Sequence, residues 1–278
     1  MTRISVHSEL RYEVRARTSF TFAVLAAETE RQHVADQDLR FTPESDVQRL
    51  RVDPSGHDLV RVTVEPGPLE LVYDATVVLA PHVPEEVPEA ETAFADLPGE
   101  TLAFLNPSRY CESDLLARFA GDTFGALPPG FGRVTGICNW IWERLSYVPG
   151  STNESTTATE VLVAVAGVCR DYAHLAISCC RALGIPARYV SGYAVDLLPP
   201  DFHGFFEAYL DGDWYLFDAT RMAPVDGLVR IASGRDAADV AFASIVGRAE
   251  LLDKQVAVVH LERTAPDDGT TAAAVATA

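Results

Sequence analysis

Residues 167–184, GVCRDYAHLAISCCRALG, form the pattern that most constrains this chain: an apolar helix with a thiol in its first turn. The helix is expected to stop near Gly184 and Pro186, because glycine favours helix termination and proline cannot continue a helix. Cys169 then stands near the helix start, where free backbone N–H groups and the helix dipole favour an anion. Such a thiol loses its proton more easily, and the thiolate is the nucleophilic form of cysteine. This segment therefore predicts a reactive cysteine.

The same position admits a second interpretation. Free cysteine is among the most buried residues and often acts as a small hydrophobic side chain. We prefer that interpretation for the other four cysteines, Cys111, Cys138, Cys179 and Cys180. None of the five belongs to a CxxC pair, and the odd count indicates reduced thiols rather than a disulfide framework or a structural zinc site. Whether Cys169 is a nucleophile thus depends on a base and an acid near it.

A candidate base and acid lie in residues 202–220, FHGFFEAYLDGDWYLFDAT. Two aromatic-rich runs flank the Asp-Gly pair at 211–212, which is favoured in the type I′ turn of a two-residue β-hairpin. That turn places Phe205 opposite Asp218, so His203 becomes a diagonal neighbour of Asp218 on the same face. A three-residue loop without a bulge shifts the register by one and puts the two on opposite faces. The hairpin therefore predicts a His–Asp pair only for the two-residue turn.

Asp218 needs a partner if it is buried, because an unpaired carboxylate amid Trp214 and Phe217 is costly. An aspartate bonded to one imidazole nitrogen leaves the other nitrogen to face a thiol. We therefore predict a catalytic constellation of Cys169, His203 and Asp218. His174 is closer to Cys169 in the chain, but five residues along a helix is about 140° around its axis, so it is not expected to face the same cleft.

These residues together resemble the transglutaminase-like superfamily of papain-related thiol enzymes. The resemblance is carried by GVCRDYAHL around Cys169, RYVSGY at 188–193, FHGFFEAYL around His203 and FDAT around Asp218. The family places a catalytic cysteine at a helix start, followed by histidine and then aspartate on neighbouring strands, and the order here is the same. SRYCESD, SYVPGST and GRDAADV resemble its bacterial members, which also carry an N-terminal strand domain.

The chain departs from the family pattern at two places. His203-Gly204-Phe205 stands where the family usually has His-Ala-Trp, and Asp218-Ala219-Thr220 stands where it has Asp-Pro-Thr. The resemblance implies an α+β fold, with a papain-like core of helices packed on an antiparallel sheet. It also implies a cysteine-dependent acyl transfer from an amide, with a protein or peptide as substrate.

The pattern along the chain predicts four regions. Residues 1–80 are expected to form a small antiparallel β-sandwich, and 81–100, with four prolines and six acids, an acidic linker. Residues 101–263 are expected to form the core, and 264–278 a disordered tail. The expected strands are 10–27, 47–52, 57–64 and 69–79, then 187–195, 202–210, 214–220, 228–232 and 255–262, with a turn at 53–56. The expected helices are 112–120, 133–145, 158–166 and 167–184.

Composition excludes several functions. The net charge of -18, from 40 acidic and 22 basic residues, repels nucleic acid and anionic membranes. No apolar run of about 18 residues is present, and the first 20 residues lack the features of a signal peptide, so a cytoplasmic location is expected. No calcium-binding loop of the EF-hand pattern appears, so neither a metal nor another cofactor is expected.

Hydrolysis of an amide through a thioester is the function we favour from the sequence. A protein-glutamine transglutaminase and a non-catalytic peptide-binding or scaffold protein on the same fold remain alternatives, and the oligomeric state is open. The polar loop 149–158 is expected to form part of the cleft edge. Four aromatic residues are candidates for the cleft lining, although each also has an interpretation as a core residue: Trp140, Trp142, Tyr193 and Phe205.

Overall fold

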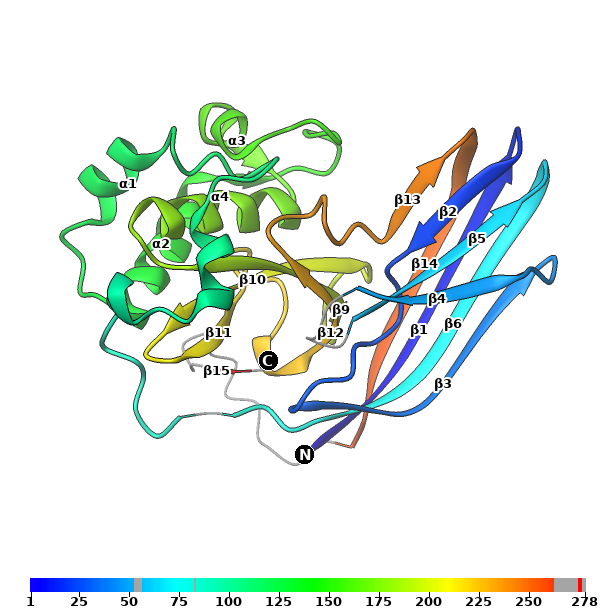
Figure 1. The fold of residues 1–278 in the computed structure, drawn as a ribbon, viewed down its shortest axis with the longest axis horizontal. Helices are drawn as coiled ribbons and strands as arrows, with labels where there is room; N and C mark the ends of the chain where they lie inside the picture. Colours follow the sequence, from blue (N-terminus) through cyan, green and yellow to red (C-terminus); the bar gives the residue numbers. More distant parts are fainter. Residues whose placement is uncertain (53–56, 83, 263–274, 277–278) are drawn as a thin grey trace.

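The computed structural model describes residues 1–52, 57–82, 84–262 and 275–276 (Figure 1). Within them, two four-stranded antiparallel sheets, with strand orders β14–β1–β6–β3 and β13–β2–β5–β4, form a β-sandwich that we call the β domain. Side chains of the two sheets meet in its core, where the Tyr12 ring lies 5.1 Å from that of Phe20. The strands are β1 Thr2–Val14, β2 Thr18–Phe22, β3 Gln32–Thr42, β4 Val47–Arg51, β5 Asp58–Val64, β6 Gly67–Leu79, β13 Ala243–Val246 and β14 Ala249–Glu262.

The period-two burial of β1 and β6 explains why these strands form a sheet. Every second residue of β6 from Leu69 to Leu79 is buried, as the sequence predicts. Strand β3 escapes prediction because it is an edge strand whose residues are mostly exposed, so no apolar alternation marks it. Strands β4 and β5 pair as an antiparallel hairpin, as expected, and the predicted turn at 53–56 lies outside the described residues.

The C-terminal strands correct the expected core boundary at residue 263. Strand β14 runs antiparallel to β1 from Arg3↔Glu262 to Val14↔Ala249, and β13 pairs with β2. Both strands therefore belong to the β domain. The physical reason is that β1 has β6 on one edge and needs a partner for the backbone groups of the other edge. The short alternating pattern at 255–262 predicts a strand but does not say which sheet it joins.

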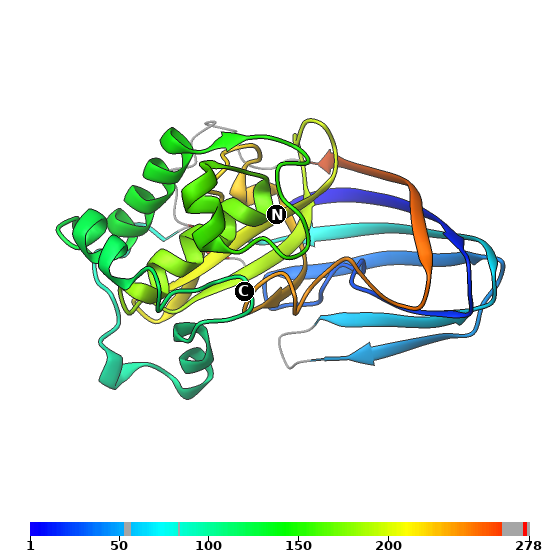
Figure 2. The same cartoon turned by 90° about the horizontal axis from the view of Figure 1, so that it is seen from above.

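The rest of the described chain forms an α+β core around a five-stranded sheet of order β12–β9–β10–β11–β15. The helices gather on one face of that sheet (Figures 1 and 2). The core elements are α1 Ala117–Phe124, α2 Phe131–Arg144, β7 Ser146–Tyr147, α3 Ala158–Ala164, β8 Ala166–Gly167, α4 Cys169–Ala182, β9 Ala187–Ala194, β10 Phe202–Leu210, β11 Asp213–Phe217, β12 Leu228–Gly234 and β15 Val275–Ala276, with short 3-10 helices at Phe94–Asp96, Gly99–Leu105 and Val225–Gly227.

Helix α4 is the central helix of the core. It is buried without interruption from Asp171 to Arg181, because α1, α2, α3 and strands β9 and β10 pack around it. This enclosure accounts for its nearly continuous apolar sequence. Among the described residues no helix has both the length and the apolar character needed to cross a membrane.

The expected linker contacts the core around Pro88 and Glu91. The Pro88 carbonyl accepts a hydrogen bond from the Phe131 N–H at 2.8 Å, and the Glu91 carboxylate pairs with Arg133 at 2.7 Å. Segment 81–100 therefore touches the start of α2. The expected disordered tail, 264–278, falls mostly outside the described residues, but Val275 and Ala276 pair with β11, so the expectation is wrong for these two.

The β domain packs against the β9–β12 side of the core sheet. The Tyr193 hydroxyl on β9 donates to the Val24 carbonyl at 2.6 Å and lies 3.0 Å from the Ser8 hydroxyl. The Gln32 side chain donates to the Arg230 carbonyl and accepts from the Arg230 N–H. These buried bonds hold the two parts of the chain in a fixed relation.

Candidate active site

Cys169 is the first residue of α4, as its sequence predicts. The preceding residue, Val168, has no side-chain oxygen with which to cap the helix. Asp171 makes the reciprocal bond of a capping box, because its Oδ2 accepts the Val168 N–H at 2.9 Å. Cys169 is partly exposed, whereas the other four cysteines are buried. The helix start therefore presents a single accessible thiol among the five.

The β10–β11 hairpin has the predicted two-residue turn. Leu210 pairs with Asp213, and Asp211 and Gly212 both have positive φ, at 47° and 90°. The His203 Nε2 lies 3.0 Å from the Asp218 Oδ2, and both side chains are almost wholly buried. His203 also lies close to Cys169, since both line one cavity and each shifts the pKa of the other. The fold thus brings the thiol, the imidazole and the carboxylate together.

Charge among these three groups opposes the cost of burial. Burial by itself disfavours the Cys169 thiolate, but the hydrogen bond and the positive charge of His203, with the Gly204 N–H, hold the thiol pKa below its usual value. Burial likewise disfavours the imidazolium of His203, yet the Asp218 charge outweighs it and raises the pKa to about 10. Burial also opposes the Asp218 carboxylate, whose pKa His203 and Thr220 nevertheless lower. The arrangement favours a thiolate–imidazolium pair.

Comparison with known proteins identifies the family. Residues 117–219 match the family model of the transglutaminase-like superfamily, and residues 2–99 match that of the bacterial transglutaminase N-terminal domain. A Cytophaga hutchinsonii protein, whose crystal structure is described as that of a "putative cysteine protease", is 40% identical, with a TM-score of 0.93 over 99% of this chain and 97% of that one. The chain belongs to the transglutaminase-like superfamily.

Curated relatives from mycobacteria match a shorter region of this chain. A Mycobacterium leprae protein is 33% identical over 117 residues, and a Mycobacterium tuberculosis protein is 39% identical over 110 residues. These alignments cover 39% and 38% of this chain, and 42% and 34% of the two relatives. The matched region thus amounts to less than half of either relative, and both are described as uncharacterised.

The first departure from the superfamily pattern, Gly204, has a steric cause. A Cβ at this position would collide with the hydroxyl of Tyr189 on the neighbouring strand β9. Glycine therefore makes room for the tyrosine ring beside the base. Phe205 contacts the His203 ring edge-on, at a centroid distance of 4.5 Å, and helps to enclose it. The exchange of Ala-Trp for Gly-Phe leaves the imidazole in contact with its two partners.

The second departure, Ala219, does not touch the carboxylate. Thr220 makes the contacts instead, since its hydroxyl donates to the Asp218 Oδ1 at 2.7 Å and its N–H donates at 2.8 Å. The Ala223 N–H lies 3.3 Å from the Oδ2. The role of Thr220 was missed from the sequence, although an Asp-x-Thr spacing permits a local turn of this kind.

Thr220→Val is expected to lower the rate at which iodoacetamide alkylates Cys169 at pH 6 by about tenfold, the effect of one lost hydrogen bond to a charged group. Valine keeps the backbone bond and the side-chain volume but not the hydroxyl, so the carboxylate that orients His203 is held less firmly. Thr63→Val, at an exposed position of the β domain, is the matched control and should leave the rate unchanged. An unchanged rate in Thr220→Val contradicts this positioning role.

The remaining thiols are unsuited to nucleophilic chemistry. Burial raises the pKa of Cys111 and Cys179 to about 12 and that of Cys138 and Cys180 still further. His174 is turned away from the thiol, as predicted. Its ring stacks on Tyr110 at 5.1 Å, its Nε2 accepts the Ala237 N–H at 3.1 Å, and burial lowers its pKa to about 3.

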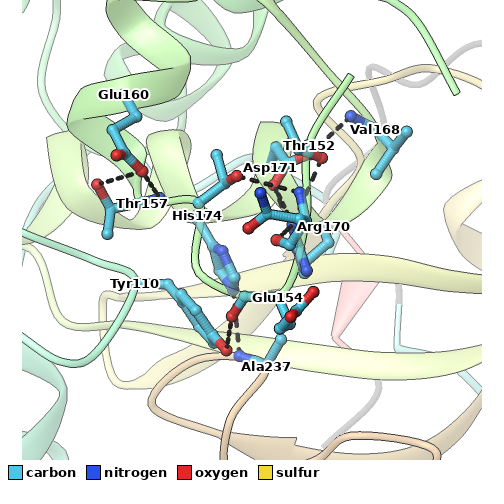
Figure 3. Close-up of polar contacts among 12 residues, drawn as sticks. Tyr110, Thr152, Glu154, Thr157, Glu160, Val168, Arg170, Asp171, His174 and Ala237 are labelled. Atoms are coloured by element: carbon cyan, nitrogen blue, oxygen red, sulfur yellow. Dashed lines mark hydrogen bonds and ion pairs between the residues drawn. The ribbon is translucent and has the colours of Figure 1, made fainter. Parts of the chain in front are cut away.

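A polar network ties the loop 149–158 to the start of α4 (Figure 3). The Thr152 hydroxyl donates to Asp171 Oδ2 at 2.6 Å, and the Arg170 guanidinium donates to Asp171 Oδ1 at 2.9 Å. Arg170 also donates to the Asn153 carbonyl at 2.7 Å. Gly167 is required here, because a Cβ would press on the Asp171 side chain. The network fixes the loop next to the helix turn that carries Cys169.

Tyr147 is a further residue of the site that sequence reasoning missed. The short parallel pair of β7 and β8 places it opposite Gly167, two residues before the thiol. Burial and the neighbouring Cys169 raise the pKa of its hydroxyl, which lies close to that cysteine. A neutral hydroxyl therefore lies beside the first N–H of α4.

The four aromatic residues expected in the cleft lie elsewhere. A cavity of about 390 Å³ opens beside Cys169 and His203, and none of the four, all within the described ranges, lines it. Tyr193 and Phe205 are fully buried, and Trp140 packs edge-on against Phe119. Trp142 is 48% exposed, and the Arg221 guanidinium covers its ring at 4.5 Å. Tyr193, Phe205 and Trp140 therefore fit their interpretation as core residues, whereas Trp142 lies on the surface.

Proposed function

We propose that this protein is a cysteine-dependent hydrolase of amide bonds in peptides or proteins. The observation that carries the proposal is that His203, paired with the buried Asp218, lines the same cavity as the Cys169 thiol. Of the five thiols, Cys169 has its pKa lowered, while burial raises that of the other four. The similarity to a structure described as a "putative cysteine protease" gives the proposal further support.

The proposed reaction has two halves. The Cys169 thiolate attacks the amide carbonyl carbon, and the C–N bond then breaks as the His203 imidazolium gives its proton to the departing amine. This leaves a thioester on the sulfur and a neutral imidazole. His203 next takes a proton from water, whose oxygen attacks the thioester carbonyl. The C–S bond breaks, the carboxylic acid leaves, and the thiolate–imidazolium pair is restored.

The negative oxygen formed in each half lies near the helix start. The N–H of Cys169 lies in the first turn of α4, close to the Tyr147 hydroxyl, and the helix dipole favours an anion there. The Tyr147 hydroxyl, kept neutral by its raised pKa, is a second donor next to the same N–H. Two donors aimed at the developing charge stabilise the transition state more than the ground state.

Selective alkylation tests the proposal. At pH 6, iodoacetamide is expected to label Cys169 rapidly and the four buried thiols hardly at all, as mapped by peptide mass spectrometry. His203→Ala should slow the labelling on the order of 100-fold, because an ordinary thiol with a pKa of about 8.5 is scarcely ionised at that pH. Equal, slow labelling of all five cysteines contradicts the enzyme and supports a non-catalytic scaffold.

A second assay separates water from an amine as the acceptor. A glutamine-containing peptide is incubated with the protein, with and without a labelled primary amine. Hydrolysis predicts that little of the labelled amine enters the peptide. Incorporation of the amine in place of water overturns the hydrolase proposal and assigns a protein-glutamine transglutaminase.

A further inference from the structure

The cavity beside Cys169 lies between the core and the β domain. Its near wall carries the Cys169 thiol and the His203 ring, and its far wall includes Ala23 and Lys254 of the β domain. Ala23 follows β2, and its N–H donates to the carbonyl of Phe242, which leads into β13. The β domain is therefore part of the site and not only an appendage of the core.

The interior of this cavity is mainly apolar. Ile231, Val240 and Ala23 are nearly inaccessible to solvent and contribute aliphatic surface to its walls. Phe242 and Phe202 stack at 5.1 Å with their rings almost parallel, and both line the cavity. An apolar side chain gains free energy when it leaves water for such a surface.

The charged groups at the cavity edge are mostly neutralised by one another. Lys254, the single lysine of the chain, pairs with Asp201 at 2.6 Å, and Arg170 pairs with the buried Asp171. Among the described residues, Glu154 has no ion-pair partner for its carboxylate. An acidic side chain would find no unpaired cation among the described residues of the lining and would meet the Glu154 charge, so the cavity disfavours anions.

We propose that this cavity binds the side chain of the substrate residue whose carbonyl is attacked, and that it selects an uncharged aliphatic or single-ring aromatic side chain. The inference rests on the proposed hydrolase function and adds the substrate class and the role of the β domain. A volume of about 390 Å³ is ample, because a single aromatic ring fits a cavity of about 150 Å³.

Peptidyl alkylating agents test the pocket directly. The probes are acetyl-glycyl, acetyl-leucyl, acetyl-phenylalanyl and acetyl-glutamyl chloromethyl ketones. In each, the thiolate forms an S–C bond and chloride leaves, so the probes share one reaction and differ in the side chain. The leucyl and phenylalanyl probes are expected to alkylate Cys169 roughly tenfold faster than the glycyl probe or more. The glutamyl probe should be no faster than glycyl.

Ala241→Trp provides the matched disruption, because Ala241 lines the cavity and is only partly buried. It should reduce the leucyl-to-glycyl rate ratio to near one, and because the ratio is taken within one variant it is corrected for any change in access to the thiol. Val246→Trp, at a position 77% exposed on β13, is the control and should keep the full ratio. Ala241→Leu fills less of the cavity. It replaces Ala241→Trp in this test if the tryptophan variant lowers the melting temperature.

The outcomes separate the two proposals. Suppose that wild-type protein reacts rapidly with iodoacetamide while the glycyl and leucyl probes react equally fast. In that case the proposed side-chain pocket is wrong, and the assignment of Cys169 as the nucleophile holds. A leucyl-to-glycyl rate ratio that is unchanged by both Ala241 substitutions also contradicts the pocket proposal. If iodoacetamide itself labels Cys169 no faster than the buried thiols, the hydrolase proposal fails, whatever the probes do.

Discussion

Cys169→Ser is expected to lower the rate of peptide amide hydrolysis by roughly 10⁴-fold or more, which is the scale seen when a catalytic nucleophile is removed. The serine oxygen occupies nearly the same place. A serine hydroxyl, however, holds its proton far more tightly than a thiol does, so His203 cannot keep the serine oxygen as an anion. The measurement is kcat/KM for release of a fluorescent amine from a leucyl peptide amide.

The control for this substitution is Cys138→Ala. Cys138 lies on α2 and is the least enclosed of the four buried thiols, so its loss should affect stability slightly and activity little. The double variant Cys169→Ser with His203→Ala should be scarcely worse than Cys169→Ser alone, because residues that act as a unit are not additive. If Cys169→Ser keeps a tenth of the activity or more, the thiol is not the nucleophile.

Glu207→Ala is expected to produce the largest loss of stability, about 3–5 kcal/mol in the free energy of unfolding. Glu207 is fully buried on β10, where Arg188 from β9 donates to its Oε2 at 2.6 Å and Arg230 from β12 donates to both carboxylate oxygens. Removing the carboxylate takes away a negative charge that both buried guanidinium groups contact. Urea unfolding measures the change, and Glu65→Ala, an exposed glutamate of the β domain, should show almost none.

The dependence of stability on acid pH is a second test of the Glu207 site. Burial opposes the charge on Glu207, but the two arginines outweigh it and lower the pKa of the carboxyl to about 2. Because the pKa is lower in the folded state, this group stabilises the fold fully above its unfolded pKa of about 4.3, and the contribution is lost as pH falls from there towards 2. Glu207→Gln should therefore flatten the loss of stability over that range. An unchanged acid profile contradicts the assignment.

The parts of the site that sequence reasoning predicted correctly are those that local spacing determines. The start of α4 follows from its termination signals and its apolar length, and the His203–Asp218 contact follows from one turn of fixed length. Both are set by residues less than 20 positions apart. A short hairpin has few possible registers, and here the Asp-Gly pair selects one of them.

Features that depend on a distant partner were not predictable from the same patterns. The polar edge strand β3 has no buried face to mark it, and the alternation in β14 suits either sheet. The prediction that four aromatic residues line the cleft was wrong, because an aromatic side chain packs in a core as readily as it lines a cleft. Lys254 reaches the cavity edge only through the pairing of β14 with β1, which no local signal specifies.

The pairing of β14 with β1 has a consequence for synthesis of the chain. Strand β1 leaves the ribosome before its edge partner β14, which follows all of the α+β core except β15, roughly 10 to 50 seconds later at ordinary rates of translation. Throughout that interval a 13-residue strand has one edge of open hydrogen-bonding groups, a state that invites pairing with other nascent chains. Slowing or truncating translation before residue 249 should therefore promote aggregation through β1, even though Cys169, His203 and Asp218 have already been made.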